Sequence, residues 1–150
     1  IVSPPQVVEA LTRVKMACGL TTSEINERAA ARVLADPAHR RYQERIRHRL
    51  TSARERVVEA LDDIGLAPLA LPDSGMYLSA GWQGPATDTA NARLVAQAAF
   101  QEGIALAPGD FFLLEQPHTT WFRFNVAHAE DPRLMAFLKR AVDQFGLGRR

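Results

Sequence analysis

The first third of the chain has hydrophobic residues at the three- and four-residue spacing of amphipathic helices. Between Pro5 and Gly19 this spacing predicts a first helix, because proline fits the first turn and glycine commonly follows a helix end. Thr21 and Glu24 have the spacing of a capping box, which predicts a second helix that ends at Asp36-Pro37. Two such helices bury too little surface to form a domain, so we expect them to pack on further chain or on a partner subunit.

An apolar seam through residues 38–64 predicts one long helix, and Gly65 is suited to cap its C-terminus. The seam consists of Ile46, Leu50, Ala53, Val57, Ala60 and Ile64. The same helix is rich in arginine, which indicates either a nucleic-acid-binding face or a solvated face with ion pairs to residues such as Glu44. We favour the solvated face, because acidic residues cancel the charge and no aromatic residues interleave.

After Gly65 the pattern changes to short strands that alternate with helices. Thr87 or Asp88 is suited to cap one helix, which Gly103 would end, and Asp131-Pro132 is suited to begin another. The expected strands cover residues 66–71, 76–82, 104–107 and 120–127. This order predicts an α+β fold: a helical front segment with one long linking helix, then a small, mostly antiparallel sheet covered by helices.

Composition narrows the class of protein. The net charge is +1, which gives no general attraction to nucleic acid or to a membrane surface, and no apolar run approaches the ~20 residues of a membrane span. The single cysteine, Cys18, excludes an internal disulfide and fits a reducing, cytoplasmic location. The four histidines show no metal-ligand spacing, so we expect no metal site.

Two residues of the first helix have reactive side chains but unremarkable surroundings. Cys18 lies among apolar residues and is expected to be a small buried residue, because the sequence identifies no base that could activate it. Lys15 lies beside the apolar face and is expected to be a rim lysine with a buried stem. The start at Ile1-Val2, before Ser3-Pro4-Pro5, looks like the end of a strand that enters a helix, and suggests a fragment of a longer protein.

Arg123 is the most informative polar residue. Strand alternation puts Phe122, Phe124 and Val126 on one face of the sheet, and Trp121, Arg123 and Asn125 on the other. A mid-strand arginine among large apolar residues is costly unless its guanidinium meets water or an anion. Its planar fork fits a carboxylate. Spacing alone leaves both readings open: an arginine on the wet face of a sheet, or a carboxylate-binding residue.

Three segments follow one another along the second part of the chain: Gly75-Met76-Tyr77-Leu78, Gly103-Ile104-Ala105-Leu106-Ala107-Pro108-Gly109 and Trp121-Phe122-Arg123-Phe124-Asn125-Val126-Ala127. In this order they resemble segments of class I/II pyridoxal-phosphate (PLP) aminotransferases, which have fold type I. The resemblance covers nearly the whole chain and divides it into three parts. Residues 1–37 would be the helical end of the large PLP domain, residues 38–65 the linking helix, and residues 66–150 the small C-terminal domain.

By this resemblance, Arg123 matches the arginine that holds the α-carboxylate of an amino-acid substrate. The cofactor would be PLP, which acts as an electron sink. The family's Schiff-base lysine would precede Ile1, so the resemblance assigns no catalytic residue to this chain and implies that the chain alone binds PLP poorly and is inactive. Cofactor-binding residues are not assigned.

Within this family, the closest similarity is to MocR-type transcription regulators of the GntR family. The segment Arg123-Phe124-Asn125-Val126-Ala127, followed by Asp131-Pro132-Arg133-Leu134, carries that similarity. It implies a PLP/effector domain that binds an amino acid, a homodimer, and DNA binding only through a separate N-terminal domain. Two alternatives remain: a fragment of a standalone aminotransferase (transaminase), and a non-catalytic α+β ligand-binding or dimerisation module.

Overall fold

The computed structural model describes residues 3–19, 21–115 and 118–147. The chain divides into two compact units, residues 1–44 and 45–150. The long helix α3 (Pro37–Asp63) contributes to both units, close to the predicted span of 38–64. The expectation that Ile1-Val2 ends a strand lies outside the described residues, and the three-part division of the chain stays a prediction.

The first unit is helical, as predicted. Helix α1 (Pro5–Cys18) and helix α2 (Glu24–Ala35) contain no buried residue. Cys18 is therefore exposed, and the expectation of a buried cysteine was wrong. Lys15 is exposed as well, in place of the buried stem that we expected. Both expectations assumed a packing partner for the apolar side of α1, and none of the described residues of the unit buries it.

The start of α2 also differs from the prediction. Ser23, and not Thr21, is the N-cap residue, and its side chain makes no capping hydrogen bond. Glu24 cannot complete a capping box, because it is the first residue of the helix and pairs with Arg28 one turn later, with 2.7 Å between the guanidinium and the carboxylate. The spacing of Thr21 and Glu24 was therefore a coincidence of sequence.

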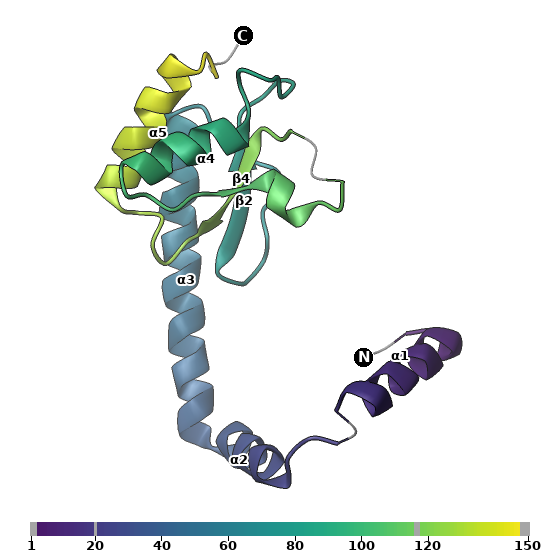
Figure 1. The fold of residues 1–150 in the computed structure, drawn as a ribbon. Coiled ribbons are helices and arrows are strands. Elements are labelled where there is room, and N and C mark those ends of the chain that lie inside the picture. Colours follow the sequence, from purple (N-terminus) through teal and green to yellow (C-terminus); the bar gives the residue numbers. More distant parts are fainter. Residues whose placement is uncertain (1–2, 20, 116–117, 148–150) are drawn as a thin grey trace. The chain divides into compact units, whose positions relative to one another are not determined.

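The second unit contains a four-stranded sheet in the order β1-β2-β4-β3, and every neighbouring pair is antiparallel. The strands are β1 (Ala67–Pro68), β2 (Tyr77–Gly81), β3 (Ala107–Pro108) and β4 (Trp121–Asn125). Helices α4 (Ala92–Gln101) and α5 (Pro132–Gln144), together with the C-terminal half of α3, pack on one face of the sheet (Figure 1). This is the α+β arrangement that the sequence predicted.

The core lies between the sheet and these three helices. Strand alternation decides which side chains enter it: Phe122 and Phe124 on β4 are 1% and 2% exposed. Their main partners from the helices are Val57, Leu61, Val95, Ala99, Phe137 and Leu138. The opposite face of the sheet, which carries Arg123, is not covered by these helices.

The arginine-rich segment of α3 is only partly a solvated face. Arg54 is 7% exposed, and it donates a hydrogen bond to the backbone oxygen of Gly75 over 2.7 Å. The expectation of solvation was wrong for this residue, because it flanks the buried seam at Ala53 and Val57. Arg56 forms an ion pair with Glu130, which ties α3 to the turn before α5.

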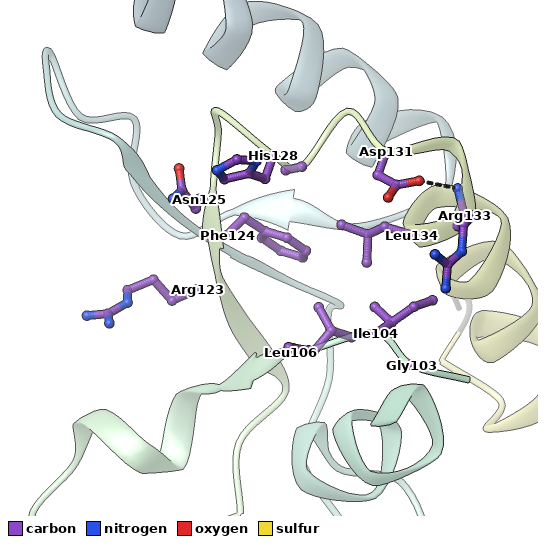
Figure 2. A pocket seen from close by; sticks show the side chains of 12 residues that line it. Gly103, Ile104, Leu106, Arg123, Phe124, Asn125, His128, Asp131, Arg133 and Leu134 are labelled. Carbon is purple, nitrogen blue, oxygen red and sulfur yellow. Dashed lines mark hydrogen bonds between the residues drawn. The ribbon is translucent and has the colours of Figure 1, made fainter. Parts of the chain in front are cut away.

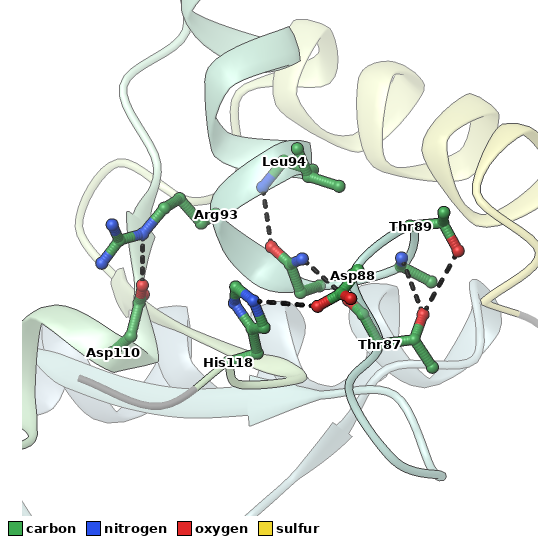
Figure 3. A network of polar contacts seen from close by, with 9 residues as sticks. Thr87, Asp88, Thr89, Arg93, Leu94, Asp110 and His118 are labelled. Carbon is green, nitrogen blue, oxygen red and sulfur yellow. Dashed lines mark hydrogen bonds and ion pairs between the residues drawn. The ribbon is translucent and has the colours of Figure 1, made fainter. Parts of the chain in front are cut away.

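The predicted start of α4 was wrong for a local reason. Helix α4 is capped by Asn91, whose side chain accepts a hydrogen bond from the Leu94 N–H over 3.0 Å, and neither Thr87 nor Asp88 caps it. Thr87 shapes the preceding turn instead, since its hydroxyl accepts from the Ala90 N–H (Figure 3). Helix α5 does begin after Asp131, as predicted.

The strands expected at residues 66–71 and 104–107 are shorter in the structure, where they form β1 and β3 of two residues each. Gly103 adopts a left-handed backbone with φ of 74°. The N–H of Ile104 then bonds back to the Ala99 carbonyl, so the chain reaches β4 only at Ala107.

Candidate functional site

The open face of the sheet carries the candidate site, centred on Arg123. Arg123 lies in the middle of β4, opposite Ser79 on β2 and Ala107 on β3. Its side chain is exposed while both neighbours in β4 are buried, as the alternation predicted. The three-strand ladder therefore gives the Arg123 backbone a fixed place and leaves the guanidinium accessible.

Two aromatic rings lie against the guanidinium. The Cζ atom of Arg123 is 3.7 Å from the ring centroid of Phe112 and 4.5 Å from that of Tyr77. Phe112 is the last residue of the short 3₁₀ helix η1 (Gly109–Phe112), and Tyr77 is the first residue of β2. Neither contact was predicted from the sequence. For Tyr77, alternation along β2 was an available signal, because it places Tyr77 on the open face beside Arg123.

An ion pair with a buried carboxylate anchors η1. Asp110 is 1% exposed, and its Oδ2 atom accepts a hydrogen bond from Nε of Arg93 on α4 over 2.6 Å (Figure 3). Its second carboxylate oxygen is buried and has no hydrogen-bond partner among the described residues. The burial of the Asp110 charge was not predicted from the sequence.

Arg123 is one of the residues that line a cavity of about 230 Å³, but its guanidinium does not point into that cavity. Figure 2 shows the Arg123 side chain pointing away from His128, Leu134 and Ile104, which line that cavity. Arg133, on the cavity side, donates to the backbone oxygen of Glu102 over 3.2 Å. The candidate site is therefore the open face and not this cavity.

The charge of Arg123 has no acidic partner in the described part of the chain, where no carboxylate lies within ion-pair distance of it. Its N–H donors lie in one plane, in a fork that matches the two oxygens of a carboxylate. The guanidinium of Arg123 therefore has no neutralising carboxylate among the described residues, contacts two aromatic rings and lies on a strand. Such a group is suited to bind an organic anion.

The only lysine in the sequence of the second unit, Lys139, does not lie at this site. Lys15 belongs to the first unit, and Lys139 lines a separate cavity with Asp62, Ile64 and Val142. Among the described residues, no group of three or more histidine, cysteine, aspartate or glutamate side chains could hold a metal ion. No helix in the described ranges is long and apolar enough to cross a membrane.

The family model described as "Aminotransferase class I and II" matches residues 1–140. No curated protein matches the chain. Among solved structures, the chain is similar to an aromatic aminotransferase from Pyrococcus horikoshii, with a TM-score of 0.73 and 20% identity. That match covers 97% of this chain and 38% of the other chain.

Two further solved structures have the same fold. A multiple-substrate aminotransferase from Thermococcus profundus gives a TM-score of 0.72 at 16% identity, over 96% of this chain and 36% of that one. An α-aminoadipate aminotransferase from Thermus thermophilus, solved with N-(5′-phosphopyridoxyl)-L-leucine, gives 0.69 at 19% identity, over 96% and 37%. The chain thus spans well under half the length of these structures.

Proposed function

Because the chain belongs to the class I and II aminotransferase family, we propose that it forms the part of a PLP-dependent domain in which Arg123 binds the α-carboxylate of an amino acid. The observation that supports this role is the exposed guanidinium of Arg123, which has no acidic partner among the described residues and is held on the middle strand of the sheet. A fixed arginine aligns the amino acid before any chemistry occurs, which lowers the entropic cost of reaction.

The described residues of the second unit do not fit the cofactor itself. PLP supplies an electron sink when bound, and the protein supplies its attachment and orientation. Attachment needs a lysine, and the only lysine in the sequence of the second unit, Lys139, lines a separate cavity with Asp62, Ile64 and Val142. In our proposal, the longer protein holds PLP through residues other than these, and this chain contributes the carboxylate contact.

For the whole protein, we propose the finer role of a PLP/effector domain in a MocR-type regulator of the GntR family. The similarity of residues 123–127 and 131–134 to that group supports this role. The protein would be a cytoplasmic homodimer that binds DNA through a separate N-terminal domain. A standalone aminotransferase is the alternative, and the full gene distinguishes the two: only the regulator has a winged-helix segment upstream.

The direct test is a spectral titration of the PLP-loaded full-length protein with a panel of amino acids. Arg123→Ala should weaken binding of the tightest amino acid by roughly 1.5–3 kcal/mol, the scale of a hydrogen bond to a charged group. It should leave cofactor loading nearly unchanged. Arg133→Ala is the matched control, because Arg133 lies on the cavity side of β4 and should leave the affinity unaltered.

Two results would refute parts of the proposal. Equal affinity of the Arg123→Ala variant and the unsubstituted protein would exclude the carboxylate role. Absence of any PLP-dependent absorbance band in the full-length protein would favour the remaining alternative, a ligand-binding or dimerisation module without a cofactor.

A further inference from the structure

The two rings beside Arg123 come from opposite sides of β4. Tyr77 belongs to β2, which pairs with one edge of β4, and its register partner is Asn125. Phe112 belongs to η1, which directly follows β3 at the other edge. Both side chains are partly exposed, at 48% for Tyr77 and 39% for Phe112. Two segments that are far apart in sequence thus bring aromatic faces to one guanidinium.

The ring contacts leave the functional part of the guanidinium free. All five N–H donors of an arginine lie in the plane of the group, whereas an aromatic face attracts the flat side of the cation. Arg123 can therefore stack on Phe112, at 3.7 Å from Cζ to the ring centroid, and still offer its donors to an anion. An exposed arginine without such contacts samples many rotamers, and an anion must then bear the entropic cost of ordering it.

Contacts with Trp121 and within η1 hold Phe112 in place. Its ring stacks on Trp121, with 6.1 Å between the centroids and 25° between the planes. Gly109, at the start of η1, lets Trp121 pack closely, because a Cβ atom there would lie 2.2 Å from the Trp121 ring. The ion pair between Arg93 and the buried Asp110 carboxylate fixes the middle of η1. These contacts restrict the side-chain conformations that Phe112 can adopt.

We propose that Tyr77 and Phe112 are positioning residues that hold the guanidinium of Arg123 in one orientation before an amino-acid carboxylate arrives. This inference rests on the proposed function, since it assigns the rings a role through Arg123. It makes a specific claim: the rings affect amino-acid affinity only as long as Arg123 is present.

A double-mutant cycle in the PLP-loaded full-length protein tests this claim, with affinity measured by absorbance titration. The probe is whichever of the twenty standard amino acids binds the unsubstituted protein most tightly. Phe112→Leu should weaken its binding about three- to tenfold, the scale of one partly exposed cation–π contact. Phe112→Tyr keeps the ring and should retain affinity within about twofold. Tyr77→Leu and Tyr77→Phe should behave in the same way.

The decisive comparison repeats Phe112→Leu in the Arg123→Ala background, where the inference predicts no further loss of affinity. An equal loss in both backgrounds would show that Phe112 acts on the fold or on the ligand directly, and would overturn the inference. Phe100→Leu is the matched control, because Phe100 lies on α4 with 73% exposure and should leave affinity unchanged. Thermal unfolding of each variant identifies any that fail to fold. Where a leucine variant fails to fold, the affinity of Phe112→Tyr or Tyr77→Phe is compared between the two backgrounds instead.

The outcome that refutes the proposed function differs from the outcome that refutes this inference. If Arg123→Ala alone leaves amino-acid affinity unchanged, Arg123 does not bind the carboxylate. Tyr77 and Phe112 then have no binding role to support. If Arg123→Ala weakens binding while Phe112→Leu and Tyr77→Leu do not, the carboxylate role stands and only the positioning role fails.

Discussion

Loss of Arg93 should destabilise the second unit, because it leaves the buried Asp110 carboxylate without its ion-pair partner. Asp110 is 1% exposed, its Oδ2 atom has Arg93 Nε at 2.6 Å, and its Oδ1 atom has no hydrogen-bond partner among the described residues. Arg93→Ala would remove the one hydrogen bond that the carboxylate has in the structure. Breaking a fully buried pair costs about 3–5 kcal/mol, and removing a hydrogen bond to a charged group about 1.5–3 kcal/mol.

The Arg93 side chain is 40% exposed, so water can partly replace it. We therefore expect Arg93→Ala to lower the free energy of unfolding by about 2–3 kcal/mol, close to the range for one hydrogen bond to a charged group. Urea unfolding monitored by the fluorescence of buried Trp82 gives this free energy for the second unit. Arg140→Ala is the control, because Arg140 and Glu102 form an ion pair with 56% and 49% exposure. Such an exposed pair is expected to contribute at most ~1 kcal/mol.

The double variant Arg93→Ala/Asp110→Ala sharpens the reasoning. If the cost comes from an unpaired buried carboxylate, removing the carboxylate as well should recover part of the lost stability. Two results would refute the account: a loss for Arg93→Ala no larger than that for Arg140→Ala, or a double variant that is less stable than the single variant by the full cost of a second, independent interaction.

Two further predictions concern other contacts of the second unit. The hydrogen bond from Arg56, followed by its charge, lowers the pKa of the Glu130 carboxyl from its ordinary 4.5, so the pair's contribution should be present above pH ~4.5 and lost as pH falls through the lower folded-state pKa. Urea unfolding of the unsubstituted protein and of Glu130→Gln should therefore differ above that window and converge below it; a constant difference would contradict the assignment. Gly109→Ala should cost about 1–3 kcal/mol because its Cβ would meet the Trp121 ring, whereas Gly19→Ala, with no atom within 4 Å, should cost little.

Local periodicity predicted those features that depend on local sequence. Residues 38–64 show one seam, and α3 covers Pro37–Asp63. Alternation between Trp121 and Asn125 predicted correctly that Arg123 is on the open face. Both results follow because helix and strand periods are set by backbone geometry and are visible within a few residues.

Features that depend on distant partners could not be predicted in this way. Thr87, Asp88 and Asn91 are all suitable N-cap residues, and the choice of Asn91 depends on where α4 packs. The contact of Phe112 with Arg123 and the burial of Asp110 depend on how η1 folds back over β4, which no local pattern reports. The burial predicted for Cys18 was wrong, because apolar neighbours in sequence do not by themselves provide a segment that packs over the residue.

The central claim is that Arg123 binds an amino-acid carboxylate, and a crystal structure of the full-length, PLP-loaded protein with its tightest-binding amino acid tests it most directly. The account predicts both carboxylate oxygens about 2.7–2.9 Å from guanidinium nitrogens of Arg123, in the plane of the guanidinium. We also expect Phe112 and Tyr77 to keep their contacts with the guanidinium, whose Cζ atom lies 3.7 and 4.5 Å from their ring centroids in the structure. A carboxylate bound by other residues, with Arg123 left in solvent, would contradict the claim.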